Sequence, residues 1–296
     1  MDTIRTFRVL KTWPARFREG FVYQGQYSKY RQRRHGSSSQ QTSSHRFLVC
    51  SQNHDQVGNR TEGDRLTELV SFDQLKPAAA TVLLSPYVPL LFMGEEYGEP
   101  APFRYFVSHG DPALVDSVRN GRRTQLARFP WSGHMADPQD ERTFLCSILN
   151  WDLRTEGHHR RLWNFYQELL RLRRDLPALA RLDKDALEAV ELADSNAIVV
   201  RRWSALSHVF AVFHFNPKPS QLAFTIPAGH WQKKLDSAEQ RWGGGVSQAS
   251  DLLVSEEKVQ MSLSPWAVVL YAQMSPEKQH QFAAENVIAG CLPGPA

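Results

Sequence analysis

The stretch FLVCSQNHDQVGNR, residues 47–60, decides the fold class of this chain. Its first four residues, 47–50, form a continuous apolar run, the pattern of a short strand buried on both faces, as in parallel sheets. The run ends abruptly in the polar residues 52–56. Because ligands of parallel α/β proteins bind at the carboxyl ends of strands, this loop is typical of a functional site. The structural alternative is that Asn53 and Asp55 only cap the next turn.

The residues after this loop predict a βαβ unit. Apolar residues at helical spacing predict a helix over residues 66–84, which Pro86 and Pro89 end. The next apolar run, residues 90–93, is expected to form a second short buried strand. A strand, a helix and a strand in this order predict a parallel sheet with a right-handed crossover.

The rest of the chain predicts a second helix and then a region of strands. An aromatic loop is expected to extend to about Trp151, and helical spacing returns over residues 160–176, which Pro177 ends. The arginines at 171, 173 and 174 are interpreted as the solvated face of that helix. From residue 197 the pattern changes to short β runs at residues 198–200, 209–215, 222–226 and 268–270. Pro, Gly and Ser turns separate these runs, which indicates a separate antiparallel domain.

Composition excludes several classes of protein. A hydrophobic fraction of 42% in 296 residues suffices for a sizeable core, and a net charge of +4 is too mild for a nucleic-acid binder. Cys50, Cys146 and Cys291 lie far apart and predict neither a zinc site nor a disulfide framework. The first residues lack the apolar core of a secretory signal, and prolines interrupt the most apolar stretch. We therefore expect a soluble, cytoplasmic protein with no nucleic-acid or membrane partner.

Two further clusters are interpreted as structural. The basic residues 31–35 lack, within the cluster itself, the aromatic platform on which single-strand binders stack bases, and they are read as part of a solvated loop. Glu156, His158 and His159 stand close together, but adjacent histidines at a helix start do not share a face. We expect no metal site and no other cofactor.

The 47–60 stretch resembles the fourth conserved region of the α-amylase family of glycoside hydrolases, which follows strand seven of a (β/α)8 barrel. Further motifs narrow the resemblance to the malto-oligosyltrehalose trehalohydrolases of that family. These motifs are GFVYQGQYS (20–28), GDRL (63–66), LLFMGEEYGE (90–99), PFRYF (102–106), VRNGRR (118–123) and SILNW (147–151). The resemblance covers about residues 18–272.

This resemblance implies an α/β fold, the C-terminal part of a (β/α)8 barrel followed by an antiparallel all-β domain. Residues 1–182 would form the partial barrel, residues 183–276 the β-domain and residues 277–296 a tail. The implied activity is hydrolysis of the α-1,4 bond that joins a maltooligosaccharide to a terminal trehalose. The implied partner is therefore maltooligosyl trehalose or another α-glucan oligosaccharide, and trehalose is the product.

The resemblance also assigns site residues. Asp55 matches the third catalytic carboxylate, the transition-state stabiliser, and His54 matches a histidine that hydrogen-bonds sugar hydroxyls. A fixed carboxylate strengthens its bonds to the sugar as positive charge develops on the flattening ring, which lowers the barrier. The other predicted substrate-binding residues are Asn53, Gln56, Val57, Gly58, Asn59, Arg60, Glu95 and Glu96. Of these, Glu95 and Glu96 are expected at the rim of the same cleft. Four aromatic residues either stack on glucose rings or belong to the core: Phe103, Tyr105, Phe106 and Trp131.

Two carboxylates that this chemistry needs are missing. A retaining enzyme uses a nucleophile and a protonated acid about 5–5.5 Å apart, and the resemblance puts both upstream of the stabiliser. Only Asp2 and Glu19 precede Asp55 as acidic residues, and neither lies in such a motif. We therefore expect this chain alone to be inactive, with a partner chain supplying the missing barrel half. The alternative is a non-catalytic carbohydrate-binding or interaction remnant.

Overall fold

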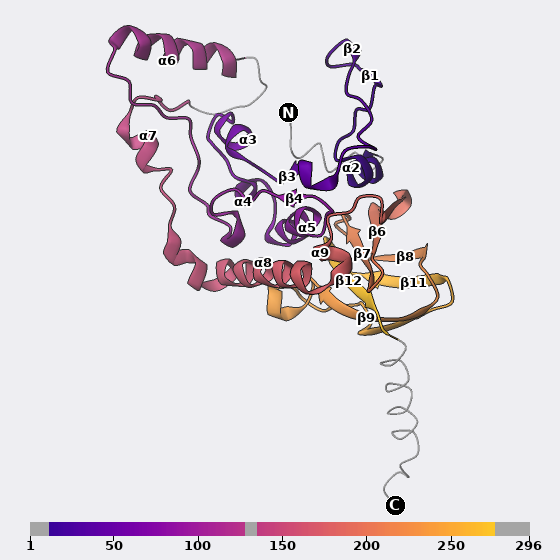
Figure 1. Ribbon diagram of the computed structural model, residues 1–296. Helices are drawn as coiled ribbons and strands as arrows, with labels where there is room; N and C mark the ends of the chain where they lie inside the picture. The colour runs from indigo at the N-terminus through magenta and orange to yellow at the C-terminus, as the bar shows by residue number, and fades with distance from the viewer. Residues whose placement is uncertain (1–11, 128–134, 276–296) are drawn as a thin grey trace, which may run out of the picture.

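The computed structural model describes residues 12–127 and 135–275, and it places a helix-rich part against a β-rich part (Figure 1). The elements of the helix-rich part are α2 (Trp13–Glu19), β1 (Tyr27–Ser28), β2 (Arg33–Arg34), η2 (Ser44–Arg46), β3 (Leu48–Val49), α3 (His54–Gly58), α4 (Leu66–Leu69), α5 (Phe72–Leu83), β4 (Val88–Pro89), η3 (Glu95–Tyr97), α6 (Pro112–Leu126), α7 (Glu141–Leu145), η4 (Trp151–Thr155), α8 (Gly157–Asp175) and α9 (Pro177–Ala180). The predicted tail, residues 277–296, lies outside the described residues.

The predicted parallel strand pair is confirmed, although its second strand begins earlier than expected. β3 and β4 pair in parallel, and α4 and α5 lie between them in the chain. The second strand lies at Val88–Pro89 and not at residues 90–93. The N–H groups of Val88 and Leu90 donate to the carbonyls of Phe47 and Val49. The N–H groups that bond to β3 therefore come from the residues on either side of Pro89, so the missing N–H of this proline costs the β3–β4 pair no hydrogen bond.

Two other predictions about this unit are wrong in detail. The helix expected over residues 66–84 is two helices, because Ser71 and Gln74 form a capping box that begins α5 anew. The first strand is not buried on both faces, since the Leu48 side chain is 70% exposed. An apolar run predicts burial only where a neighbouring layer covers it, and no described segment covers Leu48.

The prediction of a long aromatic loop before Trp151 is also wrong, because this segment contains α6 and α7. Asp111 is the N-cap of α6, where its carboxylate accepts a hydrogen bond from the Ala113 N–H, and Pro112 follows at the first helical position. Both are ordinary signals of a helix start. The apolar content of α6 is low, and Val115 is its one buried apolar residue. Periodicity therefore gave little sign of this helix.

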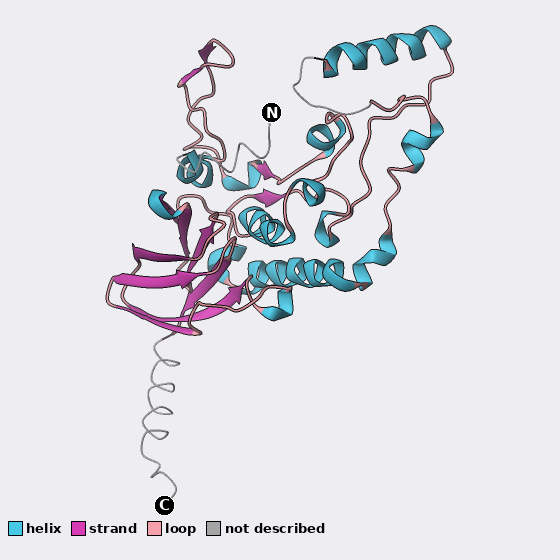
Figure 2. Ribbon diagram, turned by 180° about the vertical axis from the view of Figure 1, so that it is seen from behind, coloured by secondary structure: helices cyan, strands magenta, loops and turns pink. Residues whose placement is uncertain are grey.

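The β-rich part is the predicted antiparallel domain. Its elements are β5 (Leu187–Leu192), η5 (Ala193–Ser195), β6 (Ala197–Trp203), β7 (His208–His214), β8 (Ser220–Thr225), β9 (Gly229–Asp236), η6 (Gln240–Trp242), β10 (Leu252–Ser255), β11 (Lys258–Leu263) and β12 (Val268–Gln273). Six strands form one antiparallel sheet in the order β10-β9-β12-β7-β6-β5, and β8 pairs with β11 beside it. Figure 2 shows these strands gathered in one part of the molecule, with α8 running away from them.

The central strands of this sheet are buried on both faces. On one face, alternate residues such as Ile198, Phe213 and Leu270 pack in a single core with residues of α2, α5 and α8. On the other face, residues such as Phe210 and Tyr271 pack against β8 and β11. Successive side chains of a strand point to opposite faces, so one sheet closes both cores. The β-domain is therefore joined to the helices by a shared core.

Candidate functional site

The site candidate is the loop that leaves the carboxyl end of β3 and becomes α3. Asn53 is the N-cap of α3, and its side-chain oxygen accepts a hydrogen bond from the Gln56 N–H at 2.9 Å. The Val57 N–H donates to the Asn53 carbonyl at 3.0 Å. These bonds begin the helix directly after the strand, which fixes the direction of its first turn.

His54 and Asp55 occupy that first turn and point away from the core. Their side chains are 70% and 75% exposed, and His54 Nε2 lies 3.5 Å from Asp55 Oδ1. The capping role that was the structural alternative falls to Asn53, whereas the Asp55 carboxylate accepts no capping bond in the described residues. An imidazole and a carboxylate are thus presented side by side at a strand end, free to bind a polar ligand.

The rest of the predicted substrate-binding loop is held in place from behind. Gln56 is exposed, whereas Val57 and Gly58 are buried. Asn59 is half-buried, and Arg60 donates through Nε to the Asp64 carboxylate at 3.1 Å. The loop therefore has an exposed outer side and a buried inner side.

Arg122 of α6 was not among the predicted site residues, yet it fastens this loop. Its guanidinium donates to the Asn59 side-chain oxygen at 2.7 Å and to the Gly58 carbonyl at 2.8 Å. It also lies over the Tyr105 ring, 4.4 Å from the centroid. The VRNGRR motif was the sequence signal, but its contact with a loop 63 residues away becomes visible only in the structure.

The structure places the two glutamates of the predicted cleft rim differently. Glu95 is only 5% exposed, and its carboxylate accepts hydrogen bonds at 3.4 Å from the hydroxyls of Ser51 and Tyr166. Burial raises the pKa of Glu95 to about 7. Glu96 is half-buried. Glu95 therefore lies behind the loop and does not share the exposed surface of His54 and Asp55.

Two of the predicted aromatic residues, Phe103 and Phe106, belong to a chain of ring contacts beside the loop. Phe103 packs edge-on against Phe92 at 5.4 Å and against Phe106 at 6.2 Å, and it is half-buried. The Tyr105 and Phe106 side chains are 41% and 37% exposed. Trp131 lies outside the described residues. Of the three described, Tyr105 and Phe106 keep surface on which a sugar ring can stack.

No group of three or more His, Cys, Asp or Glu side chains within residues 12–127 and 135–275 is placed to hold a metal ion. At the Glu156 cluster, the rings of His158 and His159 lie 4.0 Å apart, and His159 Nδ1 is 2.8 Å from the Tyr97 carbonyl. Each helix in the described residues is too short or too polar to cross a lipid bilayer.

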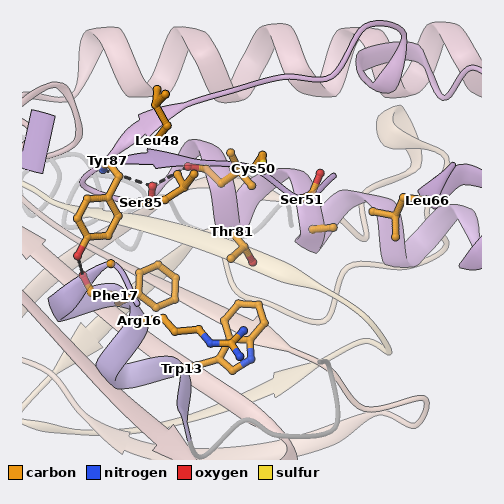
Figure 3. A pocket seen from close by; sticks show the side chains of 14 residues that line it. Trp13, Arg16, Phe17, Leu48, Cys50, Ser51, Leu66, Thr81, Ser85 and Tyr87 are labelled. Carbon is orange, nitrogen blue, oxygen red and sulfur yellow. Dashed lines mark hydrogen bonds between the residues drawn. The ribbon is translucent and has the colours of Figure 1, made fainter. Parts of the chain in front are cut away.

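A cavity of about 360 Å³ lies beside β3 (Figure 3). Its walls come from β3, α2 and α5, and most of its lining side chains are apolar or aromatic. The labelled side chains are Trp13, Arg16, Phe17, Leu48, Cys50, Ser51, Leu66, Thr81, Ser85 and Tyr87. The Tyr87 hydroxyl donates to the Phe17 carbonyl at 2.9 Å, which closes one end between β4 and α2.

Comparisons with known proteins found a matching family description and similar relatives. The family description "Alpha amylase, C-terminal all-beta domain" matches residues 190–273. A malto-oligosyltrehalose trehalohydrolase of Rhizobium sp. (strain M-11) is 41% identical over 208 residues, 69% of this chain and 34% of that protein. That of Saccharolobus solfataricus is 42% identical over 159 residues, 54% of this chain and 26% of that protein. The chain therefore spans about a quarter to a third of the length of these relatives.

Among solved structures, the chain is similar to a Salmonella typhimurium protein assigned as an alpha amylase. The two superpose with a TM-score of 0.73 at 29% sequence identity. The superposition covers 89% of this chain and 41% of the Salmonella chain. The likeness thus extends over both the helix-rich and the β-rich parts described above.

Proposed function

We propose that this chain, which belongs to the α-amylase family of glycoside hydrolases, serves in hydrolysing maltooligosyl trehalose to release trehalose. Its fold is that of the last barrel strands and helices, followed by the antiparallel β-domain. Support for the substrate comes from the trehalohydrolases that the chain resembles. We assign residues 1–182 to the partial barrel, residues 183–276 to the β-domain and residues 277–296 to a tail. We propose a cytoplasmic location, which fits Cys50 and Cys146 being free thiols in the part of the chain that the structure describes.

The observation that carries this proposal is the exposed His54–Asp55 pair at the carboxyl end of β3. In our proposal Asp55 is the transition-state stabiliser, whose carboxylate grips the hydroxyls of the sugar ring at the scissile bond. Those hydrogen bonds strengthen as the ring gains oxocarbenium character and positive charge. His54 donates to a neighbouring hydroxyl and orients the ring. In the same proposal residues 53 and 56–60 form the rest of the substrate-binding loop, and Glu96 contributes to substrate binding at its edge.

We propose that the nucleophile and the general acid come from outside these 296 residues. Among the described residues before Asp55, Glu19 is the one acidic side chain. Its carboxylate accepts hydrogen bonds from the Ser39 hydroxyl at 2.7 Å and from the Ser39 N–H at 3.2 Å, so it is committed to a structural role. We therefore expect these residues alone to hydrolyse no maltooligosyl trehalose.

The free edge of β3 supports the idea of a partner that supplies the missing barrel half. β3 has a strand neighbour in β4 alone among the described residues. In a parallel sheet alternate residues bond to opposite sides, so Leu48 and Cys50 offer backbone groups to a further strand. The exposed Leu48 side chain and the apolar cavity beside it (Figure 3) supply surface that such a partner would bury. An unpaired edge of this kind favours association.

Binding of a maltooligosaccharide to the site loop tests the proposal. We expect maltotetraose to perturb the backbone NMR signals of residues 53–60, and Asp55→Asn to weaken that binding about tenfold. Asp116→Asn is the matched control, because its carboxylate is 72% exposed, close to the 75% of Asp55, but belongs to α6. Signals of residues 53–60 that do not respond to the sugar, or equal weakening by both substitutions, would contradict the proposal.

The second candidate is a non-catalytic carbohydrate-binding remnant, which the absence of a nucleophile among the described residues before Asp55 favours. The two candidates differ in one outcome. Maltotetraose binding at residues 53–60, with no turnover even after an upstream barrel half is added, would favour the remnant. Turnover in that mixture would favour the hydrolase.

A further inference from the structure

Glu95 connects three elements behind the candidate site. It lies in η3, the next element in the chain after β4, and its side chain is almost completely buried. Its Oε2 accepts a hydrogen bond from the Ser51 hydroxyl at the end of β3, and its Oε1 accepts one from the Tyr166 hydroxyl of α8. Hydrogen bonding from the Phe92 backbone and the Gln52 side chain lowers the pKa of this carboxylate, against the larger effect of burial. Glu95 therefore links the segment that follows β3 to the long helix α8.

Gln52 extends this network to the next helix. Its side-chain oxygen accepts a hydrogen bond from the Leu66 N–H at 2.9 Å, at the start of α4, and the side chain is 5% exposed. The oxygen is thus engaged, and the amide N–H groups are the ones that face Glu95. Ser51 and Gln52 immediately precede the Asn53 cap of α3. Of the two residues that lead from β3 into the site loop, Ser51 is therefore hydrogen-bonded to this buried carboxylate, and Gln52 lies close enough to lower its pKa.

We propose that Glu95 is a positioning residue that tethers residues 51–53 and thereby sets the place of His54 and Asp55, and that it makes no contact with sugar. The inference rests on the proposed function, since positioning matters only if Asp55 acts on a substrate. It replaces the expectation that Glu95 binds substrate at the cleft rim. At 5% exposure the carboxylate offers a ligand almost no surface.

The charges around Glu95 give the tether a pH dependence. The titratable groups that face it are Cys50 at the end of β3, Arg65 before α4, Glu96 beside it in η3 and Tyr166 on α8. Burial raises the pKa of Glu95 to about 7 and outweighs the hydrogen bonds, which lower it. While the Glu95 side chain is buried against its partners, its pKa is raised, so this closed state binds the proton more tightly than an open state in which water reaches the carboxylate. Loss of the proton therefore favours the open state. The tether therefore loosens as the pH rises through about 7.

Hydrogen exchange without sugar tests this inference, so a failure of the proposed function cannot imitate a failure of the tether. The reporters are the α3 amides, in which the Val57 N–H bonds to the Asn53 carbonyl and the Asn59 N–H bonds to the Asp55 carbonyl. In the full chain at pH 6, we expect Glu95→Ala to speed their exchange about tenfold or more, with α8 and β7 unchanged. Glu95→Gln, which keeps an acceptor, is expected to stay within about threefold of the wild type.

The pH profile supplies the second readout, which remains usable if Glu95→Ala does not fold. Between pH 6 and pH 8, after correction for the intrinsic exchange rate, α3 exchange should accelerate in the wild type and not in Glu95→Gln. Glu99→Gln is the matched control, because Glu99 is a fully buried carboxylate of the same turn but binds Tyr97, Ala101 and Asn150. It should leave α3 exchange unchanged.

Three results would overturn the inference. One is unchanged α3 protection in Glu95→Ala. Another is the same pH dependence in Glu95→Gln as in the wild type. The third is equal acceleration of α3 by Glu99→Gln, which would make the effect a general loss of stability.

Discussion

At the scale of single residues, the buried carboxylates of Glu95 and Glu99 differ in how closely their partners approach. Glu99 accepts hydrogen bonds of 2.7–2.9 Å from the Tyr97 hydroxyl and from the N–H groups of Ala101 and Asn150. The hydroxyls of Ser51 and Tyr166 reach Glu95 only at 3.4 Å. Long hydrogen bonds compensate poorly for the loss of water around a charge, which is the physical reason that burial dominates at Glu95.

Glu95 should therefore make the stability of the protein depend on pH. Its pKa is raised from 4.5 to about 7 in the folded state, so the folded protein holds the proton more tightly than the unfolded chain does. The resulting stabilisation is present in full below pH 4.5 and is lost as the pH rises through about 7, in total about 3 kcal/mol. Urea unfolding of the wild type and of Glu95→Gln from pH 5 to pH 8 measures the difference. The same pH dependence of the free energy of unfolding in the two proteins would refute this assignment.

Arg122 should be important for the geometry of the site loop. Arg122→Ala removes the charged hydrogen bonds to the Gly58 carbonyl and the Asn59 side chain and the contact with the Tyr105 ring. We expect a loss of about 2 kcal/mol in the free energy of unfolding, with Arg122→Lys restoring part of it. Chemical denaturation of the three proteins measures this. The contact would be of no consequence if Arg122→Ala matched the wild type.

Residues of the candidate site were predictable to the extent that they share one short stretch of sequence. Asn53, His54 and Asp55 follow a strand directly, so their placement at its carboxyl end could be predicted from residues 47–60 alone. Arg122 and the buried position of Glu95 depend on contacts across 63 and 44 residues. Hydropathy patterns carry no information on such contacts, because they describe only neighbours along the chain.

At the scale of elements, two arginines satisfy the carboxyl end of α5 and the turn that follows it. Arg202 of β6 donates to the carbonyls of Leu84 and Ser85, both at 3.0 Å, and is 2% exposed. Arg173 of α8 donates to the carbonyls of Leu83 and Ser85 at 2.6 and 2.8 Å. The interpretation of Arg173 as part of a solvated face is therefore wrong. A helix end needs donors for its last carbonyls, and long arginine side chains reach them from neighbouring elements.

Removing one of these donors should be costly. Arg202→Met removes the guanidinium that donates to the Leu84 and Arg181 carbonyls, while Ser85 keeps its hydrogen bond from Arg173. We expect it to lower the free energy of unfolding by about 3 kcal/mol. Arg201→Met is the matched control on the same strand, because the Arg201–Glu188 ion pair is partly exposed and such pairs contribute about 0–1 kcal/mol. Thermal and urea unfolding compare the two. Equal losses would show that Arg202 does not support the helix end.

Element prediction succeeded where the hydrophobic pattern was strong. The stripe from Leu162 to Leu172 on α8 is buried as its spacing predicted, and β6, β7, β8 and β12 lie close to the predicted runs. β5, β9, β10 and β11 were missed, and polar residues interrupt the apolar runs of β5, β9 and β11. In β9, for example, Lys233 and Lys234 lie within the strand. A strand of this composition becomes apparent only through its partners, β10 and β12.

At the scale of the whole molecule, the helices and the six-stranded sheet share one hydrophobic core. Ile198, Phe213 and Leu270 of the sheet pack in the same cluster as Leu83 of α5 and Phe165 of α8. Separating the parts would expose both surfaces to water, at about 25 cal/mol per Å² of apolar area. The two parts should therefore stabilise each other.

We accordingly expect the chain to unfold in one cooperative transition, and residues 183–276 alone to be less stable and to bind a hydrophobic dye. Differential scanning calorimetry of the chain and of the excised β-domain tests this. Two separate transitions in the full chain, or an excised domain with an unchanged melting temperature, would contradict a shared core.

The most direct test of the central claim is a complementation assay for trehalose release. The chain is mixed with the separately produced segment of the Rhizobium relative that precedes the matched C-terminal part, and maltooligosyl trehalose is the substrate. We predict no release by either polypeptide alone, release by the mixture, and a rate about a hundredfold lower when the chain carries Asp55→Asn, with Asp116→Asn as the unaffected control. Trehalose release by the chain alone, or a mixture that associates and is inactive or insensitive to Asp55→Asn, would contradict the account.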